Sequence, residues 1–296
     1  MIETHALTKR YGRFTALDHC DLAIERGEVF GLLGPNGSGK TTLLRLLLGF
    51  LRPSAGHATL DQLDCHRHGK AVRAKVAYLP GDARLFRNMR GRDVLRFFCD
   101  VRRDADFDRA LALAERLDVE LDRTVAFLST GTRQKLALAA VLAADTPVLV
   151  LDEPTANLDP TIRAEVIALV LEAKRAGRTV IFSSHVLDEV EAACDRVAIL
   201  RAGKLAHLQT TRELRAVHVV RATFHGEAPS PPAGELSAVA VFRPVGEALE
   251  IECPGGLAPV LRWLADQPVA EVHVDRVGLA SVYHRFHPPR DGRCAR

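Results

Sequence analysis

A glycine-rich run at residues 34–42 has the residue types and spacing of a phosphate-binding loop. Its sequence, GPNGSGKTT, lies between an expected strand at Glu28–Leu33 and an expected helix at Thr41–Leu48. Glycines let the backbone wrap closely around a phosphate, whose charge is balanced by backbone N–H groups, the helix N-terminus and the Lys40 ammonium. The Thr41 hydroxyl is expected to ligate Mg²⁺. The run predicts a nucleotide-phosphate site formed by Gly34, Pro35, Asn36, Gly37, Ser38, Gly39, Lys40, Thr41 and Thr42.

Two consecutive carboxylates, Asp152 and Glu153, follow a second apolar run at Val148–Leu151. Consecutive apolar residues are typical of a strand that is buried on both faces. Asp152, at the end of this strand, is expected to hold Mg²⁺ or its water, and Glu153 can polarise an attacking water as a general base. Together with the phosphate loop, this pair predicts hydrolysis of a nucleoside triphosphate.

The elements that must position these groups alternate between strands and helices up to about residue 210. This alternation predicts an α/β fold with a mixed, mostly parallel sheet. Between roughly Arg84 and Ala144 the pattern is helical throughout, with Phe107, Leu111 and Ala114 on one helix face, and we expect an inserted helical lobe at about residues 82–145. The expected strands are Glu28–Leu33, Lys75–Leu79, Val148–Leu151, Thr179–Ser183 and Val197–Leu200.

The chain is expected to divide into a nucleotide-binding domain at residues 1–212, a small C-terminal α+β domain at 213–287 and a disordered tail at 288–296. The run HGEAPSPPAG at 225–234 is rich in Pro and Gly and predicts a loop. After this loop, the patterns indicate strands and helices at Leu236–Arg243, Ala248–Cys253, Leu257–Asp266, Val269–Asp275 and Leu279–Phe286.

The composition, with 296 residues, a formal charge of +3 and 47% hydrophobic residues, is that of a soluble globular protein of two domains. The near balance of charge gives no whole-molecule attraction to nucleic acid, and no nucleic-acid partner is expected. Residues 1–10 carry charges where a signal peptide would be apolar, and no stretch approaches the roughly 20 apolar residues that span a bilayer. The cysteines lack metal-ligand spacing, which predicts reduced thiols of a cytosolic protein; they are Cys20, Cys65, Cys99, Cys194, Cys253 and Cys294.

With these features in place, the chain resembles the nucleotide-binding subunit of an ABC transporter. The family is distinguished by a signature usually written LSGGQ, which reads LSTGT at residues 128–132. Ser129 and Gly131 match the signature, whereas Thr130 and Thr132 depart from it in a way that resembles export-type branches of the family. The resemblance implies that Ser129 and the Gly131 N–H, at the head of a helix, bind the γ-phosphate of ATP held by a partner subunit.

Further family elements follow in the right order, and the resemblance covers nearly all of residues 1–210. The run Asn157–Asp159 resembles the D-loop, which implies that Asp159 contacts the other subunit. His185 resembles the switch histidine, which implies hydrogen bonds to the γ-phosphate and to the attacking water. Tyr11 resembles the aromatic residue that stacks on the adenine ring.

The clearest departure from the family is at the Q-loop, where a Gln normally follows the strand and reaches Mg²⁺ and the water. Here Val76–Pro80 is followed by Gly81 and Asp82. Either Asp82 or a water replaces the missing side chain, and we favour the water because Asp82 is displaced by one residue. The departure bears on coupling to a transmembrane partner and leaves the prediction of ATP binding unchanged.

The expected helical lobe carries arginines interleaved with apolar residues. In the family this surface receives the coupling helices of the membrane subunits, which implies a hydrophobic groove rimmed by arginines. A solvated basic face is the alternative, and both interpretations stay open at this stage. The residues are Arg84, Arg87, Arg90, Arg92, Arg96, Arg102 and Arg103, with Leu85, Phe86, Val94, Leu95, Phe97 and Phe98 between them.

The resemblance implies a subunit that binds and hydrolyses ATP with Mg²⁺ at the cytoplasmic face of the cell membrane and powers a separate transmembrane permease. The altered signature and Q-loop favour an exporter of drug, antibiotic, lipid or polysaccharide. A dimer is part of the mechanism because neither half-site encloses the γ-phosphate alone; we expect a homodimer, with a heterodimer as the alternative. The C-terminal domain is expected to be regulatory or to stabilise the dimer.

Functions of other classes stay open. A soluble ABC-type ATPase that acts on nucleic acid or ribosomes usually has two ATPase modules or a long coiled coil, and neither is visible in the sequence. A P-loop kinase for small molecules would not have the signature, D-loop and switch histidine. A third alternative is mechanical work on a membrane partner without transport of a solute.

Overall fold

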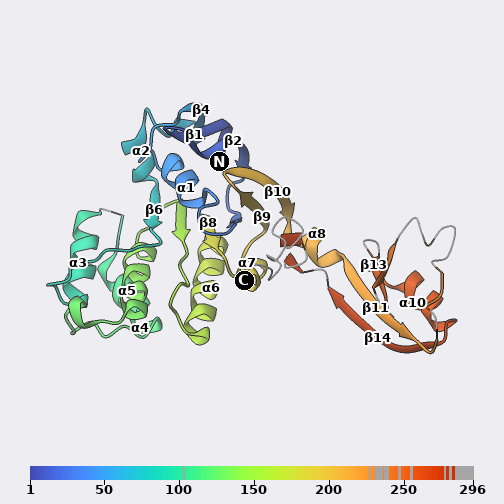
Figure 1. The fold of residues 1–296 in the computed structure, drawn as a ribbon. Helices are drawn as coiled ribbons and strands as arrows, with labels where there is room; N and C mark the ends of the chain where they lie inside the picture. Colours follow the sequence, from blue (N-terminus) through green and yellow to red (C-terminus); the bar gives the residue numbers. More distant parts are fainter. Residues whose placement is uncertain are drawn as a thin grey trace, which may run out of the picture. The chain divides into compact units, whose positions relative to one another are not determined.

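The chain divides into two compact units, Met1–Leu208 and Gln209–Arg296, and each has buried hydrophobic side chains of its own (Figure 1). The computed structural model describes residues 1–102, 104–226, 228–230, 236, 240–245, 248–253, 256–276, 278–279 and 282–283. Within these residues, no helix is long and apolar enough to cross a bilayer.

A six-stranded sheet forms the centre of the first unit. Its strands are β3 (Val29–Leu33), β6 (Val76–Leu79), β7 (Val148–Asp152), β8 (Thr179–Ser184), β9 (Arg196–Arg201) and β10 (Lys204–Thr210). The strand order is β10-β9-β3-β8-β7-β6, and the pairs that link β9 through to β6 are parallel. All residues of β3, β7 and β8 are buried, as expected for strands covered on both faces. The mixed, mostly parallel sheet predicted from the sequence is confirmed.

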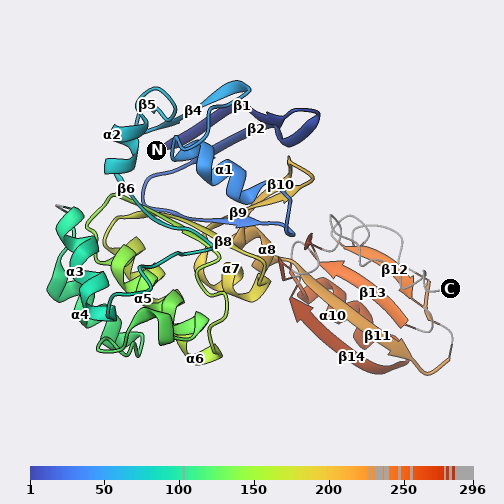
Figure 2. The ribbon, with the colours of Figure 1, turned by 60° about the vertical axis from the view of Figure 1, so that its left-hand side comes forward.

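Helices cover both faces of this sheet, as two views of the ribbon show (Figures 1 and 2). They are α1 (Lys40–Leu47), α2 (Gly69–Ala74), α6 (Pro160–Arg175) and α7 (Leu187–Ala193). Helices α6 and α7 pack against β3 and β8, whereas α1 packs on the other side. The expected helix at Thr41–Leu48 is therefore present and begins one residue earlier, directly after the glycine-rich loop.

A second sheet in the first unit was not among the predicted elements. It contains β1 (Ile2–Tyr11), β2 (Phe14–Ile24), β4 (Ala55–Leu60) and β5 (Leu63–Asp64) in the order β2-β1-β4-β5, and all its pairs are antiparallel. Polar residues on its buried face interrupt the apolar pattern. Thr4, for example, is buried and donates from Oγ1 to Cys20 O at 2.8 Å.

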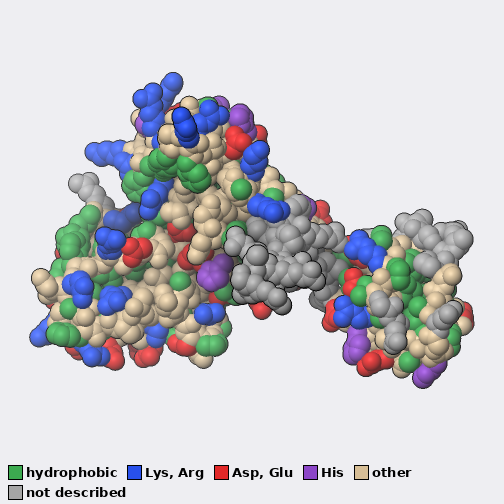
Figure 3. All heavy atoms as spheres, viewed as in Figure 1, with side chains coloured by type: hydrophobic (Ala, Val, Ile, Leu, Met, Phe, Trp, Pro, Cys, Tyr) green, Lys and Arg blue, Asp and Glu red, His purple; other side chains and the backbone are tan. Residues whose placement is uncertain are grey.

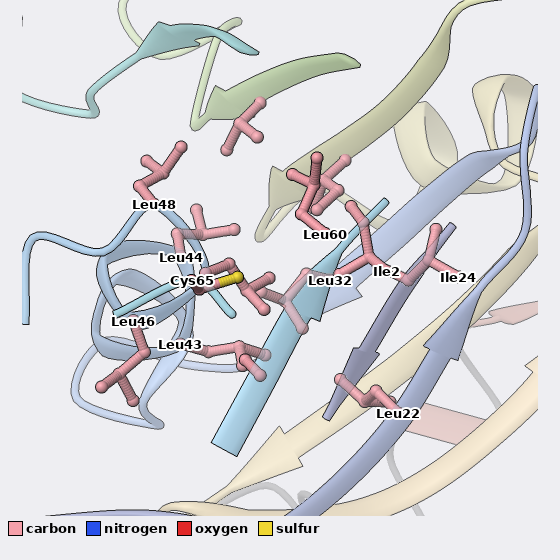
Figure 4. Close-up of a cluster of buried hydrophobic side chains, with 14 of the residues drawn as sticks. Ile2, Leu22, Ile24, Leu32, Leu43, Leu44, Leu46, Leu48, Leu60 and Cys65 are labelled. Carbon is pink, nitrogen blue, oxygen red and sulfur yellow. The ribbon is translucent and has the colours of Figure 1, made fainter. Parts of the chain in front are cut away.

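A hydrophobic core lies around α1, between the two sheets. Figure 4 shows Leu43 and Leu44 of α1 among Ile2, Leu32 and Leu60, which come from strands of both sheets. Burial of one such side chain stabilises the fold by about 1.5–3 kcal/mol. This packing fixes the start of α1, and with it the loop that precedes α1.

The helical lobe is formed by α3 (Gly91–Val101), α4 (Phe107–Arg116), a short 3-10 helix at Val125–Phe127 and α5 (Thr130–Leu142). The expectation that the lobe is helical from residue 84 onward is wrong for residues 84–90, which are not helical. Pro80 and Gly81 precede this segment, and Arg90 instead forms an isolated antiparallel bridge with Thr124. Arg103, one of the lobe arginines, and Cys294 lie outside the described residues.

One arginine ties the lobe to the sheet-covering helix α6. Arg116, at the end of α4, donates to Glu165 Oε1 at 2.8 Å and to both carboxylate oxygens of Glu172 at 2.9 Å. The Arg116 guanidinium holds the pKa of the Glu172 carboxyl below its ordinary value. Because the contact is bidentate, it fixes geometry more firmly than a single surface ion pair.

The described part of the second unit contains an antiparallel sheet, and Val260 and Leu264 of a helix pack against the sheet's buried side chains. Its elements are α8 (Thr211–Ala216), β11 (His218–Phe224), β12 (Val241–Val245), β13 (Ala248–Cys253), α10 (Ala258–Ala265) and β14 (Val269–Arg276), and the strand order is β12-β13-β11-β14. The expected α+β character is present. The expected segment Leu236–Arg243 contributes its strand only from Val241 onward, and Ala240 N donates to Leu236 O at 3.0 Å as in a helical turn. Most of the expected run 279–286 and all of the tail lie outside the described residues.

Candidate functional site

The glycine-rich loop joins β3 to α1 and has a backbone that only glycine can adopt at two positions. Gly34 and Gly39 have φ angles of 155° and 109°, in the region that L side chains rarely occupy. A Cβ at Gly34 would lie 2.5 Å from Leu200 O, and one at Gly39 would lie 2.7 Å from Ala16 O. The loop therefore keeps its tight curve only with glycine at these places.

Lys40 places its ammonium group inside this loop. Its side chain is 6% exposed, and Nζ donates to Gly34 O at 2.6 Å and to Pro35 O at 3.4 Å. Nζ also lies 3.5 Å from Glu153 Oε1. The cation is thus held at the meeting point of the loop and the end of β7.

A crevice of about 190 Å³ opens over the loop. It is lined by Phe14, Ala16, Pro35, Asn36, Gly37, Ser38, Gly39, Lys40, Thr41 and Thr42. Within the described residues, the buried Ser38 Oγ has no hydrogen-bond partner. An orphaned hydroxyl beside a buried cation suits an anionic ligand that accepts hydrogen bonds.

Asp152 lies at the end of β7, where its carboxylate meets two hydroxyls, one from Thr41 of α1 and one from Ser183 of β8. Its side chain is buried, and its Oδ2 accepts a hydrogen bond from Thr41 Oγ1 at 3.0 Å. Its Oδ1 accepts one from Ser183 Oγ at 2.6 Å. A carboxylate and a hydroxyl beside the loop form an oxygen donor set of the kind that Mg²⁺ prefers.

Glu153 stands in a backbone conformation that is rare for a side chain of its kind. Its φ angle is 52°. Its N–H donates to two oxygens of Ser183, the carbonyl oxygen at 3.1 Å and Oγ at 3.0 Å. Left-handed residues of this kind are concentrated at functional sites, where the surrounding contacts hold the strain. The turn places the Glu153 carboxylate beside the loop, 3.5 Å from Lys40 Nζ.

His185 contacts the same carboxylate from the end of β8. Its Nδ1–H donates to Glu153 Oε2 at 2.6 Å, while the side chain is 61% exposed. The structure therefore brings Lys40, Thr41, Asp152, Glu153 and His185 together, although they come from segments far apart in the sequence.

The signature residues and the D-loop residue Asp159 lie outside this group, at the starts of α5 and α6. Ser129 Oγ caps α5 by accepting from Thr132 N at 3.0 Å, with Gly131 in the first turn. Asp159 caps α6 by accepting from Ile162 N at 3.0 Å, which lowers the pKa of the Asp159 carboxyl. Ser129, Gly131 and Asp159 are not among the residues that line the crevice over the loop.

Two contacts connect the start of α5 to the segment after β7. A Cβ at Gly131 would lie 2.7 Å from Asn157 O, so the two backbones approach as closely as glycine allows. The buried Gln134 donates from Nε2 to Glu153 O at 3.3 Å and to Pro154 O at 3.2 Å. The sequence did not point to Gln134, because its role depends on where the helix meets the turn.

The aromatic residue that lines the crevice over the loop is Phe14, whereas the sequence pointed to Tyr11. Tyr11 and Phe14 are partners across the turn between β1 and β2. Phe14 lines the crevice over the loop and is 63% exposed, whereas Tyr11 lies under the Lys9 ammonium, 5.0 Å from its ring centre. Phe14 was missed because the hairpin that brings it to the loop was not predicted.

Gly81 and Asp82 occupy the position of the missing Q-loop Gln. A Cβ at Gly81 would lie 3.4 Å from Asp152 O, so the backbone there passes beside the carboxylate end of β7. The Asp82 side chain is 80% exposed and accepts from Arg84 Nε at 3.1 Å. Asp82 is thus engaged at the surface, while Gly81 is the residue next to the site.

A larger crevice of about 430 Å³ lies where the lobe meets the central sheet. Its apolar wall includes Phe50, Tyr78 and Phe98, and burial raises the pKa of Tyr78 to about 12. Among the described lobe arginines, Arg84 and Arg102 line it. Figure 3 shows hydrophobic side chains interleaved with Lys and Arg side chains over this lobe.

A glycine-rich loop that surrounds a buried lysine, opposite a carboxylate at the end of a neighbouring parallel strand, defines the class of P-loop nucleotide-binding proteins.

Residues 17–156 match the family model "ABC transporter". The chain is 40% identical over 214 residues to the daunorubicin resistance ATP-binding protein DrrA3 of Streptomyces coeruleorubidus. The aligned region covers 70% of this chain and 67% of DrrA3. The chain is 34% identical to the ABC transporter ATP-binding protein NatA of Bacillus subtilis, over 65% of this chain and 80% of NatA. The chain therefore belongs to the family of ABC transporter ATP-binding proteins, and the resemblance seen in the sequence is confirmed.

Other relatives are longer or more distant. The probable multidrug ABC transporter ATP-binding protein YbhF of Escherichia coli is 35% identical over 73% of this chain, which spans 38% of the length of YbhF. Among solved structures, the dimeric ATP-binding cassette MJ0796, in a post-hydrolysis state with ADP and Pi, has a TM-score of 0.66 and 22% identity. That likeness covers 72% of this chain and 99% of MJ0796 and supports the α/β fold expected from the sequence.

Proposed function

We propose that this protein hydrolyses ATP and supplies the energy for an ABC exporter whose transmembrane permease is a separate chain. The observation that carries the proposal is the convergence of the Lys40 ammonium, the Glu153 carboxylate and the His185 ring at the glycine loop. These groups have the chemistry for binding a triphosphate and activating a water beside it. The names of two relatives, the daunorubicin resistance protein DrrA3 and the probable multidrug transporter protein YbhF, support a drug-like cargo.

Each group has a distinct role in the proposed reaction. Lys40, now bonded to loop carbonyls, would donate to the β- and γ-phosphates, and the N–H groups of residues 34–42 would cradle them. Thr41 and Asp152 would hold Mg²⁺, which neutralises charge on the phosphate oxygens when it is bound. So few protein ligands suffice because Mg²⁺ keeps several waters and binds the phosphates themselves.

Glu153 would act as the general base. Its carboxylate lies between the Lys40 ammonium and the His185 ring, so it can accept a proton from water while its position stays fixed. His185 donates from Nδ1, which leaves Nε2 for the γ-phosphate or the water. At the position of the missing Q-loop Gln, the engagement of Asp82 with Arg84 supports a water as the replacement.

A dimer is part of the proposal because Ser129, Gly131 and Asp159 do not line the crevice of their own loop. They are placed at helix starts, where N–H groups and the helix dipole favour an anion. We infer that they complete the ATP site of a second subunit, in a homodimer or a heterodimer. The C-terminal unit is proposed to regulate or stabilise this dimer.

The crevice of about 430 Å³ is proposed to receive a helix of the permease. An apolar wall with arginines at its edge suits an amphipathic helix near anionic lipid headgroups. This arrangement supports the groove interpretation of the lobe surface, and it would place the protein at the cytoplasmic face of the cell membrane.

We expect Phe14→Ala to weaken ATP binding about tenfold, and more than Tyr11→Ala, because Phe14 lines the crevice and stacking on a base contributes about 1–3 kcal/mol. Calorimetric titration of each purified variant with ATP measures the two affinities and checks this prediction. A larger loss with Tyr11→Ala would return the stacking role to Tyr11.

The proposed function is tested by measuring phosphate release from ATP by the purified chain with Mg²⁺ and with a chelator of Mg²⁺. We expect turnover that disappears with the chelator, because Thr41 and Asp152 need the ion to act on the phosphates. Static light scattering with ATP checks the dimer in the same samples. Bound ATP without phosphate release, in a chain that stays monomeric, would contradict the proposal.

A further inference from the structure

Thr132 makes a side-chain contact that the usual Gln of the signature could not make in this way. Its Oγ1 lies 2.8 Å from Ser129 Oγ, and its own N–H donates to the same Ser129 Oγ at 3.0 Å. One residue therefore contacts the Ser129 hydroxyl through both its backbone and its side chain. Ser129 itself is exposed at the start of α5.

The hydrogen-bonding capacity of a hydroxyl decides what this contact can do. A hydroxyl has one proton to donate and two lone pairs that accept. One lone pair of Ser129 Oγ is occupied by Thr132 N. If the Thr132 hydroxyl donates to the other lone pair, the Ser129 proton has no remaining role within the pair and is available to an external acceptor.

We propose that Thr132 is a positioning residue that orients the Ser129 hydroxyl as a donor to the γ-phosphate of ATP held by a second copy of the chain. The inference rests on the proposed function and extends it to a residue at which this chain departs from the usual signature. An anion at Ser129 favours the direction Thr132 to Ser129 to phosphate, because each hydrogen bond in such a chain polarises the next. The two threonines of this signature then have different roles.

Thr130 provides the matched comparison within the same loop. Its Oγ1 accepts from Arg133 Nη2 at 3.2 Å, and Arg133 Nη1 also donates to Leu128 O at 2.7 Å. The Thr130 hydroxyl is thus directed to Arg133 and not to Ser129. Removing it deletes a threonine hydroxyl of the same loop without touching the proposed donor chain.

The test measures ATP-dependent dimer formation by light scattering in the hydrolysis-deficient Glu153→Gln protein. Thr132→Val keeps the shape and the backbone N–H of Thr132 but removes the hydroxyl. We expect it to raise the ATP concentration for half-maximal dimer about tenfold, the effect of weakening one hydrogen bond to a charged group. Thr132→Ser should stay within about twofold of the parent, and Thr130→Val should behave like Thr132→Ser.

Two further readouts separate positioning from a general structural effect. The affinity of the monomer for ATP, measured at protein concentrations too low for dimers, should be the same in all four proteins, as should the thermal unfolding temperature. Equal dimerisation by the Thr132→Val protein and its parent would overturn this inference alone. A parent protein that stays monomeric at saturating ATP would overturn the proposed dimer, and the inference with it.

Discussion

Replacing Glu153 with Gln should lower the turnover number for ATP at least about 100-fold and leave ATP binding nearly unchanged, since a general base contributes roughly that much or more to the rate. The amide has the shape of the carboxylate but cannot accept the proton of the attacking water. Its amide oxygen can still accept a hydrogen bond from the Lys40 ammonium or from the His185 ring, which lie 3.5 Å and 2.6 Å from the two carboxylate oxygens of Glu153. The binding site should therefore stay intact, and the closed dimer should accumulate with ATP.

The measurement is phosphate release under single-turnover conditions, with ATP affinity determined in parallel. Glu115→Gln, on the exposed surface of α4, is the matched control and should keep the parent rate. A Glu153→Gln protein that hydrolyses ATP at a tenth of the parent rate or faster would show that another group accepts the proton. In that case the left-handed turn at Glu153 would have a structural role only.

Replacing Lys40 with Met should weaken ATP binding by about 10- to 100-fold and remove detectable hydrolysis, because a hydrogen bond to a charged group contributes about 1.5–3 kcal/mol. Met retains much of the apolar stem of Lys40 and deletes the ammonium group, with its charge and its hydrogen bonds to the loop carbonyls. The change also leaves the Glu153 carboxylate, which is 19% exposed, without the cation 3.5 Å away. Both losses act on the same site, so binding and catalysis should fall together.

Isothermal titration with ATP and circular dichroism during heating check this second result. Lys70→Met, at an exposed position of α2, is the matched control and should bind ATP as the parent does. Unchanged affinity in the Lys40→Met protein would mean that the phosphates bind outside the loop. A large fall in the unfolding temperature would instead assign the effect to the fold, because Lys40 bonds the carbonyls of Gly34 and Pro35.

The phosphate loop could be predicted well because its requirements are local. Glycine at positions 34 and 39 is needed by backbone angles within the loop and by carbonyls that pass beside it. The flanking strand and helix were recognisable from short apolar patterns, and both are present. Elements of this kind can be predicted from sequence because their formation does not depend on contacts with distant parts of the chain.

Contacts between distant strands could not be read in the same way. Asp152 meets Ser183 because β7 and β8 pair in parallel with these two residues in register, and no sequence pattern fixes that register. Phe14 reaches the crevice through an antiparallel hairpin whose buried polar residues, such as Thr4, hide the strand pattern. The roles of these residues depend on the assembled sheets.

In the proposed dimer, Gln134 would connect the two ATP sites. Its side chain holds the backbone carbonyls of Glu153 and Pro154, and it stands one turn from Ser129, which would contact nucleotide bound by the other subunit. If nucleotide bound by the other subunit displaced α5, the Gln134 hydrogen bonds would transmit that displacement to the backbone turn that positions the Glu153 carboxylate. Occupancy of one site would in this way set the timing of water attack in the other, so the two turnovers would not be independent events.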